Sequence, residues 1–218
     1  MIKVVHPLNL GWLEKKLSDQ EMDYLWRCIE NKNQDPRYRS TLAGNISGSY
    51  ELMDRGDWFF TNTVTPIITE YIKEFSDISK GYPTSASHAY FISRWWVNYQ
   101  KQTQFIPLHN HSGLYSFVIW MKIPYDSKEQ GKKYGLFDMA TAISPDVNSI
   151  ARCGNFQFNY VNILGNPNTY RYPLDKSSEG TMMFFPAKLQ HEVFPFYGCD
   201  EERVSISGNV SFNTARMV

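Results

Sequence analysis

Three of the five histidines have a spacing that suits metal binding. His109 and His111 are two residues apart in PLHNHSG, at the expected start of a strand, so both imidazoles should project from one face of a sheet. His191 lies on a later expected strand, within TMMFFPAKLQHEVFPF. If the strands close into a barrel, the three rings can point into one cavity. Converging neutral imidazoles suit a first-row divalent ion such as Fe(II), with positions left open for substrate or oxygen.

A run of polar side chains follows on a late expected strand. Arg203, Ser205, Ser207 and Asn209 alternate at period two, so they share one face. That face must meet either solvent or a polar cavity. A guanidinium with a hydroxyl two residues later can bind a carboxylate through two parallel hydrogen bonds and one more. Beside a metal site, such a pair fits an oxo-acid cosubstrate.

The elements that must position these residues change character near residue 88. From there on, apolar and polar residues alternate at period two, with many β-branched and aromatic residues. We expect six or more strands, separated by turns rich in Pro, Gly, Asn and Asp, and therefore an antiparallel sandwich or barrel. The segments are HAYFISRWWVNYQ, LYSFVIWMKIP, NFQFNYVNIL, TYRYP, TMMFFPAKLQHEVFPF and RVSISGNVSF.

Two helices are expected before residue 88. Ser18 and Glu21 form a capping box at the start of a helix over about 19–31. A second apolar stripe at helical spacing covers 57–76, with Pro66 as a kink or early-turn residue. We therefore predict one domain over residues 1–218, in which residues 1–87 are mainly helical and residues 88–218 form the β core. Candidate walls of the site are residues 32–58, the polar insertion 124–150 and the loop 163–180.

Charge and cysteine content narrow the function classes. Lysine plus arginine total 22, aspartate plus glutamate total 22, and the formal net charge is therefore zero. This balance argues against a protein that holds nucleic acid or an anionic membrane by bulk charge. The three cysteines are far apart and odd in number, which favours a reducing compartment. We expect a cytoplasmic protein, in the host cytoplasm if a phage encodes it.

Several of these segments together resemble a known family. Three motifs are similar to those of the double-stranded β-helix dioxygenases: HNHSG, EGTMMFFPAKLQH and ERVSIS. The resemblance implies a jelly-roll, cupin-like barrel fold. It also implies that the protein uses Fe(II) and 2-oxoglutarate, as those dioxygenases do. Two longer segments resemble a branch of oxygenases that is common in tailed-phage and bacterial genomes: WWVNYQKQTQFIPLHNHSGLYSFVIWMKIP and LAGNISGSYEL. The resemblance covers most of the chain, and its sharpest motifs lie between residues 95 and 213.

The resemblance implies a role for individual residues. His109 matches the first metal ligand, and His191 matches the distal histidine that follows a G…FP turn. Arg203 matches the arginine that pairs with the far carboxylate of 2-oxoglutarate, and Ser205 matches the hydroxyl that assists it. Tyr99, ten residues before His109, stands where related prolyl hydroxylases have a tyrosine that contacts the cosubstrate.

One position departs from the superfamily pattern. Most members have a carboxylate where this chain has His111. Three neutral imidazoles give the site one negative charge fewer, which should weaken binding of a divalent metal. The resembled branch shares HxH, and strand geometry favours His111 as the third ligand beside His109. Alternatives are water completing a two-histidine site with His111 adjacent to it, or a carboxylate from Asp138 or Glu192.

The function implied is that of an Fe(II)- and 2-oxoglutarate-dependent dioxygenase. We expect a hydroxylase that acts with O2 on a peptide side chain, an amino acid or a small metabolite. Two alternatives stay open: a cupin-like three-histidine dioxygenase that needs no 2-oxoglutarate, and a non-catalytic phage or bacterial binding module on the same barrel. We expect no nucleic-acid or membrane partner. A homodimer through the N-terminal helices is compatible with the sequence, which carries no signal for it.

Overall fold

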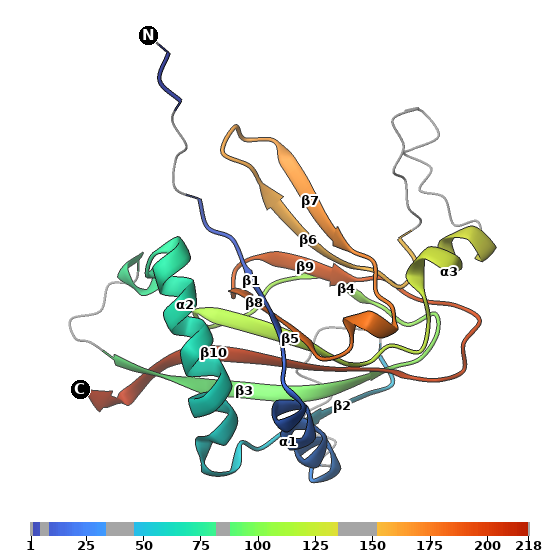
Figure 1. Cartoon of the computed structure of the whole chain (residues 1–218), viewed down its shortest axis with the longest axis horizontal. Helices are drawn as coiled ribbons and strands as arrows, with labels where there is room; N and C mark the ends of the chain where they lie inside the picture. The colour runs from blue at the N-terminus through green and yellow to red at the C-terminus, as the bar shows by residue number, and fades with distance from the viewer. Residues whose placement is uncertain (1, 5–8, 34–45, 82–87, 135–151, 218) are drawn as a thin grey trace.

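Two antiparallel sheets face each other in the computed structural model, which describes residues 2–4, 9–33, 46–81, 88–134 and 152–217. The larger sheet has six strands in the order β1-β8-β5-β10-β3-β2, and the smaller has four in the order β4-β9-β6-β7 (Figure 1). This is the expected double-stranded β-helix, or jelly roll. The strands are β1 (Leu13–Lys16), β2 (Gly48–Glu51), β3 (His88–Gln100), β4 (Ile106–His109), β5 (Tyr115–Lys122), β6 (Phe156–Val161), β7 (Pro167–Tyr172), β8 (Thr181–Pro186), β9 (Gln190–Val193) and β10 (Arg203–Met217).

Helices α1 (Asp19–Glu30) and α2 (Thr65–Phe75) lie on the outer side of the larger sheet, whereas α3 (Ser127–Tyr134) lies apart from them (Figure 1). A π-helical turn, Phe60–Val64, runs directly into α2. Short 3-10 helices cover Arg55–Asp57, Ile78–Gly81 and Lys176–Ser178. Within the described ranges, no helix combines the length and the apolar character that crossing a membrane requires.

The period-two pattern of the larger sheet divides its side chains between two cores. Outward-facing residues such as Val97 on β3 and Ile206 on β10 belong to one hydrophobic core with Leu25 of α1 and Tyr71 of α2. Inward-facing residues of β5 and β8 pack between the sheets with Phe156 and Phe158 of β6 and other aromatic residues. Both faces of the sheet are therefore covered, which explains why nearly all of β5 is buried.

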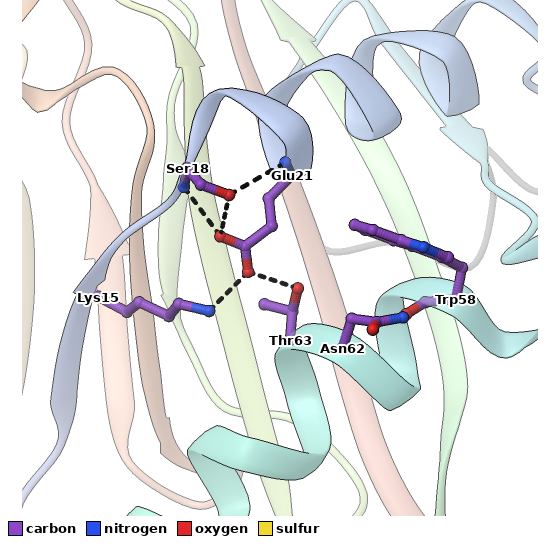
Figure 2. A network of polar contacts seen from close by, with 6 residues as sticks. All are labelled: Lys15, Ser18, Glu21, Trp58, Asn62 and Thr63. Atoms are coloured by element: carbon purple, nitrogen blue, oxygen red, sulfur yellow. Dashed lines mark hydrogen bonds and ion pairs between the residues drawn. The ribbon is translucent and has the colours of Figure 1, made fainter.

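The predicted helix over 19–31 is confirmed as α1, including the capping box of Ser18 and Glu21. The Glu21 carboxylate also joins three elements (Figure 2). One oxygen accepts hydrogen bonds from Lys15 of β1 and Thr63 of the π-helical turn, both at 2.6 Å, and the other accepts from the backbone and hydroxyl of Ser18. Burial raises the pKa of Glu21, but these bonds outweigh it and hold the pKa at about 2.

The second predicted helix, 57–76, is present with an irregular start. The backbone N–H of Thr65 donates to the carbonyl of Phe60, a π-type bond, and Pro66 stands in the first turn of α2. A proline is tolerated there because the first N–H groups of a helix have no partner within it. Pro66 is therefore an early-turn residue, which is one of the two roles predicted for it; the other was a kink.

The structure departs from prediction in several strands and in the insertion between β5 and β6. The segment 181–196 is two strands, β8 and β9, joined by a turn at residues 187–189. Strands β1 and β2 were not predicted, and they pair with β8 and β3. The N-terminal part of the chain thus contributes to the larger sheet and is not only helical. The insertion 124–150 contains α3 from residue 127 onward, and its residues 135–150 lie outside the described ranges.

Candidate metal centre and active-site cavity

Three histidines from two adjacent strands converge between the sheets. His109 ends β4 and pairs in register with His191 of β9, and His111 follows β4 by two residues. The potential ligand atoms of the three rings all lie within 4.8 Å of one another. The prediction that the HxH pair begins a strand is wrong, because the pair stands where β4 ends. The predicted convergence of the three rings is nevertheless confirmed.

Hydrogen bonds orient two of the rings. Nδ1 of His109 lies 2.8 Å from the carbonyl oxygen of Pro107, and Nδ1 of His191 lies 2.9 Å from that of Leu189. A carbonyl only accepts, so each Nδ1 carries the hydrogen and each Nε2 keeps its lone pair for a metal. Nε2 of His111 and Nε2 of His191 are 3.2 Å apart. Two nitrogen ligands at right angles on one ion, each about 2.1 Å from it, are separated by about 3 Å.

Burial keeps the three imidazoles neutral. His191 is 4% exposed, and burial followed by the proximity of His109 and His111 holds its pKa well below the usual value. Burial and the neighbouring His109 lower the pKa of His111 to about 4, and burial lowers that of His109. A histidine must be neutral to bind a metal through its lone pair. The triad therefore has the protonation state of a metal site at neutral pH.

Backbone contacts fix the loop that carries His111. The N–H of His111 donates to the carbonyl of Ala187, in the turn between β8 and β9, at 2.8 Å. Two residues later, Gly113 has a φ of +98°, a conformation that favours glycine. A Cβ atom at Gly113 would lie 2.7 Å from the carbonyl oxygen of Val210 on β10. The loop thus passes so close to β10 that only glycine fits at position 113. This close approach fixes the position of His111 beside His109 and His191.

A cavity of about 510 Å³ contains the triad. One wall is apolar and comes mainly from the smaller sheet and β5. The opposite wall is polar and comes from β3 and β10. The apolar wall includes Ile106, Val118, Trp120, Phe156, Phe185 and Val193, and the polar wall includes Asn98, Gln100, Ser205, Ser207 and Asn209. The polar face predicted for β10 therefore meets a cavity and not solvent.

The two carboxylates weighed as replacements for His111 are not found at the triad. Glu192 follows His191 on β9, so its side chain projects from the opposite face of the strand. There its carboxylate accepts hydrogen bonds of 3.0 Å from the amides of Gln157 and Asn159. Asp138 lies outside the described ranges. Among the described residues, His111 is the third group that completes the cluster.

Arg203 lies beyond one end of the cavity and is 1% exposed. Its guanidinium donates to the hydroxyl of Tyr125 at 2.5 Å and to the side-chain oxygen of Gln100, and it lies over the rings of Tyr125 and Phe196. Within the described ranges no carboxylate pairs with it. Gln100 lines the cavity, whereas Arg203 does not. The side-chain amide of Gln100 therefore lies between the cavity and the guanidinium of Arg203.

Ser205 lies on the cavity side of β10, next to the Arg203 position. Its side chain makes no hydrogen bond with the other described residues, although the residue is only 8% exposed. By contrast, the Ser207 hydroxyl accepts from Asn98, whose own side-chain oxygen accepts from Ser49 at 2.7 Å. Ser205 is thus a buried hydroxyl available to a ligand in the cavity, whereas Ser207 belongs to a fixed network.

The structure does not bring Tyr99 to the triad. Asn98 and Gln100 on β3 face the cavity, so Tyr99 between them projects from the other side of the sheet. There its ring contacts Tyr50 and the ammonium group of Lys32. The spacing of ten residues before His109 placed Tyr99 on the right strand but on the wrong face.

Sequence reasoning missed Gln100, Tyr125 and Arg94. The first and last were within reach, because Arg94, Asn98 and Gln100 lie at even spacings on β3, interrupted only by Trp96, and so resemble the period-two polar pattern that was noticed on β10. Tyr125 follows β5 in an irregular segment, and no local pattern marks it. Its role depends on a contact with Arg203, which is 78 residues away.

Comparison with known proteins agrees with this site. Residues 94–209, more than half of the chain, match the sequence profile of a family described as "Putative 2OG-Fe(II) oxygenase". No curated protein matches the chain. A 2OG-Fe(II) oxygenase-family oxidoreductase from Burkholderia pseudomallei is 16% identical, with 92% of this chain and 84% of that chain covered and a TM-score of 0.50. This similarity shows the shared fold.

Two further solved structures are prolyl hydroxylases. The prolyl-4-hydroxylase of Pseudomonas putida is 14% identical, with 94% of each chain covered and a TM-score of 0.46. The prolyl hydroxylase of Trichoplax adhaerens, in complex with a hypoxia inducible factor peptide fragment, is 11% identical, with 93% of this chain and 83% of that chain covered and a TM-score of 0.46.

Proposed function

Because the chain belongs to the 2OG-Fe(II) oxygenase family, we propose that it is a hydroxylase in which His109, His111 and His191 hold Fe(II) while Arg203 and Ser205 bind the far carboxylate of 2-oxoglutarate. The observation that carries this proposal is the pairing of a convergent, neutral imidazole triad inside the cavity with a buried guanidinium just beyond one end of it, bound to the cavity residue Gln100. A buried cation without a carboxylate partner is costly, and an anionic cosubstrate would remove that cost.

Each of these residues has a task that its surroundings support. The carbonyls of Pro107 and Leu189 orient His109 and His191 so that their Nε2 atoms face the ion. Arg203, braced by Tyr125, would exchange its bond to Gln100 for the cosubstrate carboxylate, and the Ser205 hydroxyl would donate to the same carboxylate. The apolar wall excludes water around the reacting carbon.

When bound, Fe(II) and 2-oxoglutarate supply the oxidation: O2 is reduced, 2-oxoglutarate loses CO2 to become succinate, and one oxygen atom enters a C–H bond. The protein positions the C–H bond beside the triad and keeps the cavity dry.

The proposal is tested by product analysis. Protein, Fe(II), 2-oxoglutarate and O2 are incubated together, and succinate is measured by NMR alongside oxygen consumption. We expect succinate to form slowly even without a primary substrate, and to disappear in His109→Ala and His191→Ala. His88→Ala, which removes a histidine at the start of β3 outside the triad, is the matched control and should keep the wild-type rate.

Two other outcomes would contradict the proposal. Oxygen consumption without succinate would favour the three-histidine dioxygenase that needs no cosubstrate. Failure of the wild type to bind Fe(II) would favour a non-catalytic module on the same barrel.

A further inference from the structure

The two ends of the cavity differ in their exposure to solvent. Arg203, beyond one end, is 1% exposed, whereas Ser93 and Ser112 at the other end are exposed. Asn209 belongs to the exposed end: it lies six residues beyond Arg203 on β10, about 20 Å at the usual rise, and its carbonyl accepts from the Ser93 hydroxyl at 3.2 Å. If 2-oxoglutarate lies at the Arg203 end, the primary substrate enters past Asn209.

Asn209 also lies beside the loop that carries His111. Its inward-facing neighbour Ser211 touches this loop, because a Cβ atom at Gly113 would lie 2.9 Å from the Ser211 hydroxyl. Trp96, on the neighbouring strand β3, has its ring centre 5.8 Å from that of His111 and is two residues from the position paired with Asn209. A substrate that reaches the triad from the exposed end therefore passes along Asn209.

A buried hydroxyl holds the oxygen end of the Asn209 side-chain amide. Ser116 on β5 is 0% exposed and pairs in register with Asn209. Its hydroxyl donates to Oδ1 of Asn209 at 3.0 Å and to the carbonyl oxygen of Gly208 at 2.8 Å, in a three-centre hydrogen bond. The nitrogen end of the amide therefore points away from Ser116.

The nitrogen end has no hydrogen-bond partner among the described residues. Asn209 is 6% exposed and lines the cavity, and its printed side-chain bond is the one that its oxygen accepts from Ser116. Asn98 on the same wall differs, because its NH2 group donates to Ser207 while its oxygen accepts from Ser49. A buried donor without an acceptor is unfavourable, so a ligand that supplies an acceptor gains from the contact.

The chemistry of these donors favours a neutral acceptor. The NH2 group of Asn209 carries no formal charge, and neutral donors compensate poorly for the water that an ionised group loses on burial. Arg94, which pairs with Asn209 on the ladder, already has partners within the protein, among them the ring of Trp96. The acceptor that suits Asn209 is a neutral carbonyl oxygen, which has two lone pairs and no charge to desolvate.

We propose that Asn209 is a specificity-determining residue that binds the carbonyl oxygen of a neutral amide in the primary substrate, and that Ser116 is the positioning residue that orients it. This inference rests on the proposed function and narrows its substrate class. The amide belongs either to a peptide main chain or to the side chain of a small molecule such as asparagine or glutamine. Both sources present the same group to Asn209.

The test uses two sets of amides as probes. The twenty common L-amino acids, blocked as N-acetyl-N-methylamides, present main-chain amides, whereas free asparagine and glutamine present side-chain amides. Each probe is titrated anaerobically into protein loaded with Fe(II) and 2-oxoglutarate, and binding is followed by ligand-observed NMR and by the change in the visible charge-transfer absorption. We expect at least one probe to bind, and binding confined to one set identifies the source of the amide.

Two variants remove the donors. Asn209→Leu keeps the approximate volume of the side chain, and Asn209→Ala gives the same test without a bulky group. Each should bind the probe roughly three- to tenfold more weakly than the wild type, the effect of one lost neutral hydrogen bond. Their affinity for 2-oxoglutarate should stay within about twofold of the wild-type value, since the cosubstrate lies at the other end.

Two further variants separate this result from a general effect. Ser116 is not among the residues that line the cavity, so a loss of probe affinity of about twofold or more in Ser116→Ala reports the lost orientation of Asn209. Asn62→Leu makes the matched substitution at an exposed residue of the π-helical turn, outside the cavity, where Figure 2 shows it beside Trp58. It should leave the probe affinity unchanged.

Two results would overturn the role of Asn209: no probe of either set binding to the wild type, or equal probe binding in the wild type and in the folded Asn209 variants. Equal probe binding in the wild type and Ser116→Ala would overturn the role of Ser116. The charge-transfer absorption separates these failures from that of the proposed function. If the absorption forms with 2-oxoglutarate but probe binding does not depend on Asn209, only this inference is wrong. If it does not form in the wild type, the proposed function itself fails.

Discussion

Replacement of Arg203 by alanine should weaken 2-oxoglutarate binding without preventing Fe(II) binding. In the proposed complex the buried guanidinium donates to a carboxylate in place of Gln100. Hydrogen bonds to a charged partner contribute about 1.5–3 kcal/mol, so the Kd for 2-oxoglutarate should rise roughly 10- to 150-fold. The Kd for Fe(II) should change little, because Arg203 has no contact with the three histidines.

The assay is anaerobic calorimetry of 2-oxoglutarate binding to the Fe(II)-loaded protein. Ser205→Ala and Ser207→Ala form a matched pair, since each removes one hydroxyl from the same face of β10. Ser205→Ala should weaken binding up to about tenfold, whereas Ser207→Ala should not, because its hydroxyl already accepts from Asn98. A folded Arg203→Ala variant that binds 2-oxoglutarate within twofold of wild type would refute the assigned role.

Three further substitutions test the surrounding structure. Gln100→Ala removes a partner of buried Arg203, so it should lower stability by about 1–3 kcal/mol and enlarge the increase in Tm caused by 2-oxoglutarate; an unchanged increase would contradict this. Gly113→Ala brings a Cβ against the Val210 carbonyl and should raise the Kd for Fe(II) at least roughly tenfold, measured by anaerobic titration. Glu21 has a folded-state pKa of about 2, below its unfolded value, so its stabilisation is present above about pH 4.5 and is lost as the pH falls toward 2. Glu21→Gln should therefore lower stability at pH 7 by about 1–3 kcal/mol and flatten the acid limb of urea unfolding; an acid limb identical to wild type would count against the network.

The regular elements were predictable where one local signal was strong. The capping box of Ser18 and Glu21 placed the start of α1, and alternation over residues 88–100 gave the whole of β3. The short strands β1 and β2 have four residues each and are held by pairing with β8 and β3, so their sequences carry little signal of their own. The turn inside 181–196 was hidden by apolar residues that continue through it.

The site could be predicted only at residues that a local sequence pattern marks. His109, His111 and His191 could be grouped because their residue type is rare in this chain, and Arg203 because it opens a polar run on one face. Tyr99 was assigned from its distance along the chain alone. Side chains on β3 alternate between the two faces of the sheet, and Tyr99 lies on the face that points away from the cavity. Contacts between distant segments, such as that of Tyr125 with Arg203, follow from the packing of the two sheets and leave no local trace.

The most direct test of the central claim is an anaerobic titration of the metal-free protein with Fe(II) and 2-oxoglutarate, monitored by the visible metal-to-ligand charge-transfer absorption. We expect the absorption in the wild type, its loss or a marked shift in His111→Ala, and its persistence in Asn110→Ala, which alters the exposed neighbour of His111. Iron binding without this absorption in the wild type would contradict the cosubstrate assignment. An identical absorption in His111→Ala would contradict a three-histidine metal site.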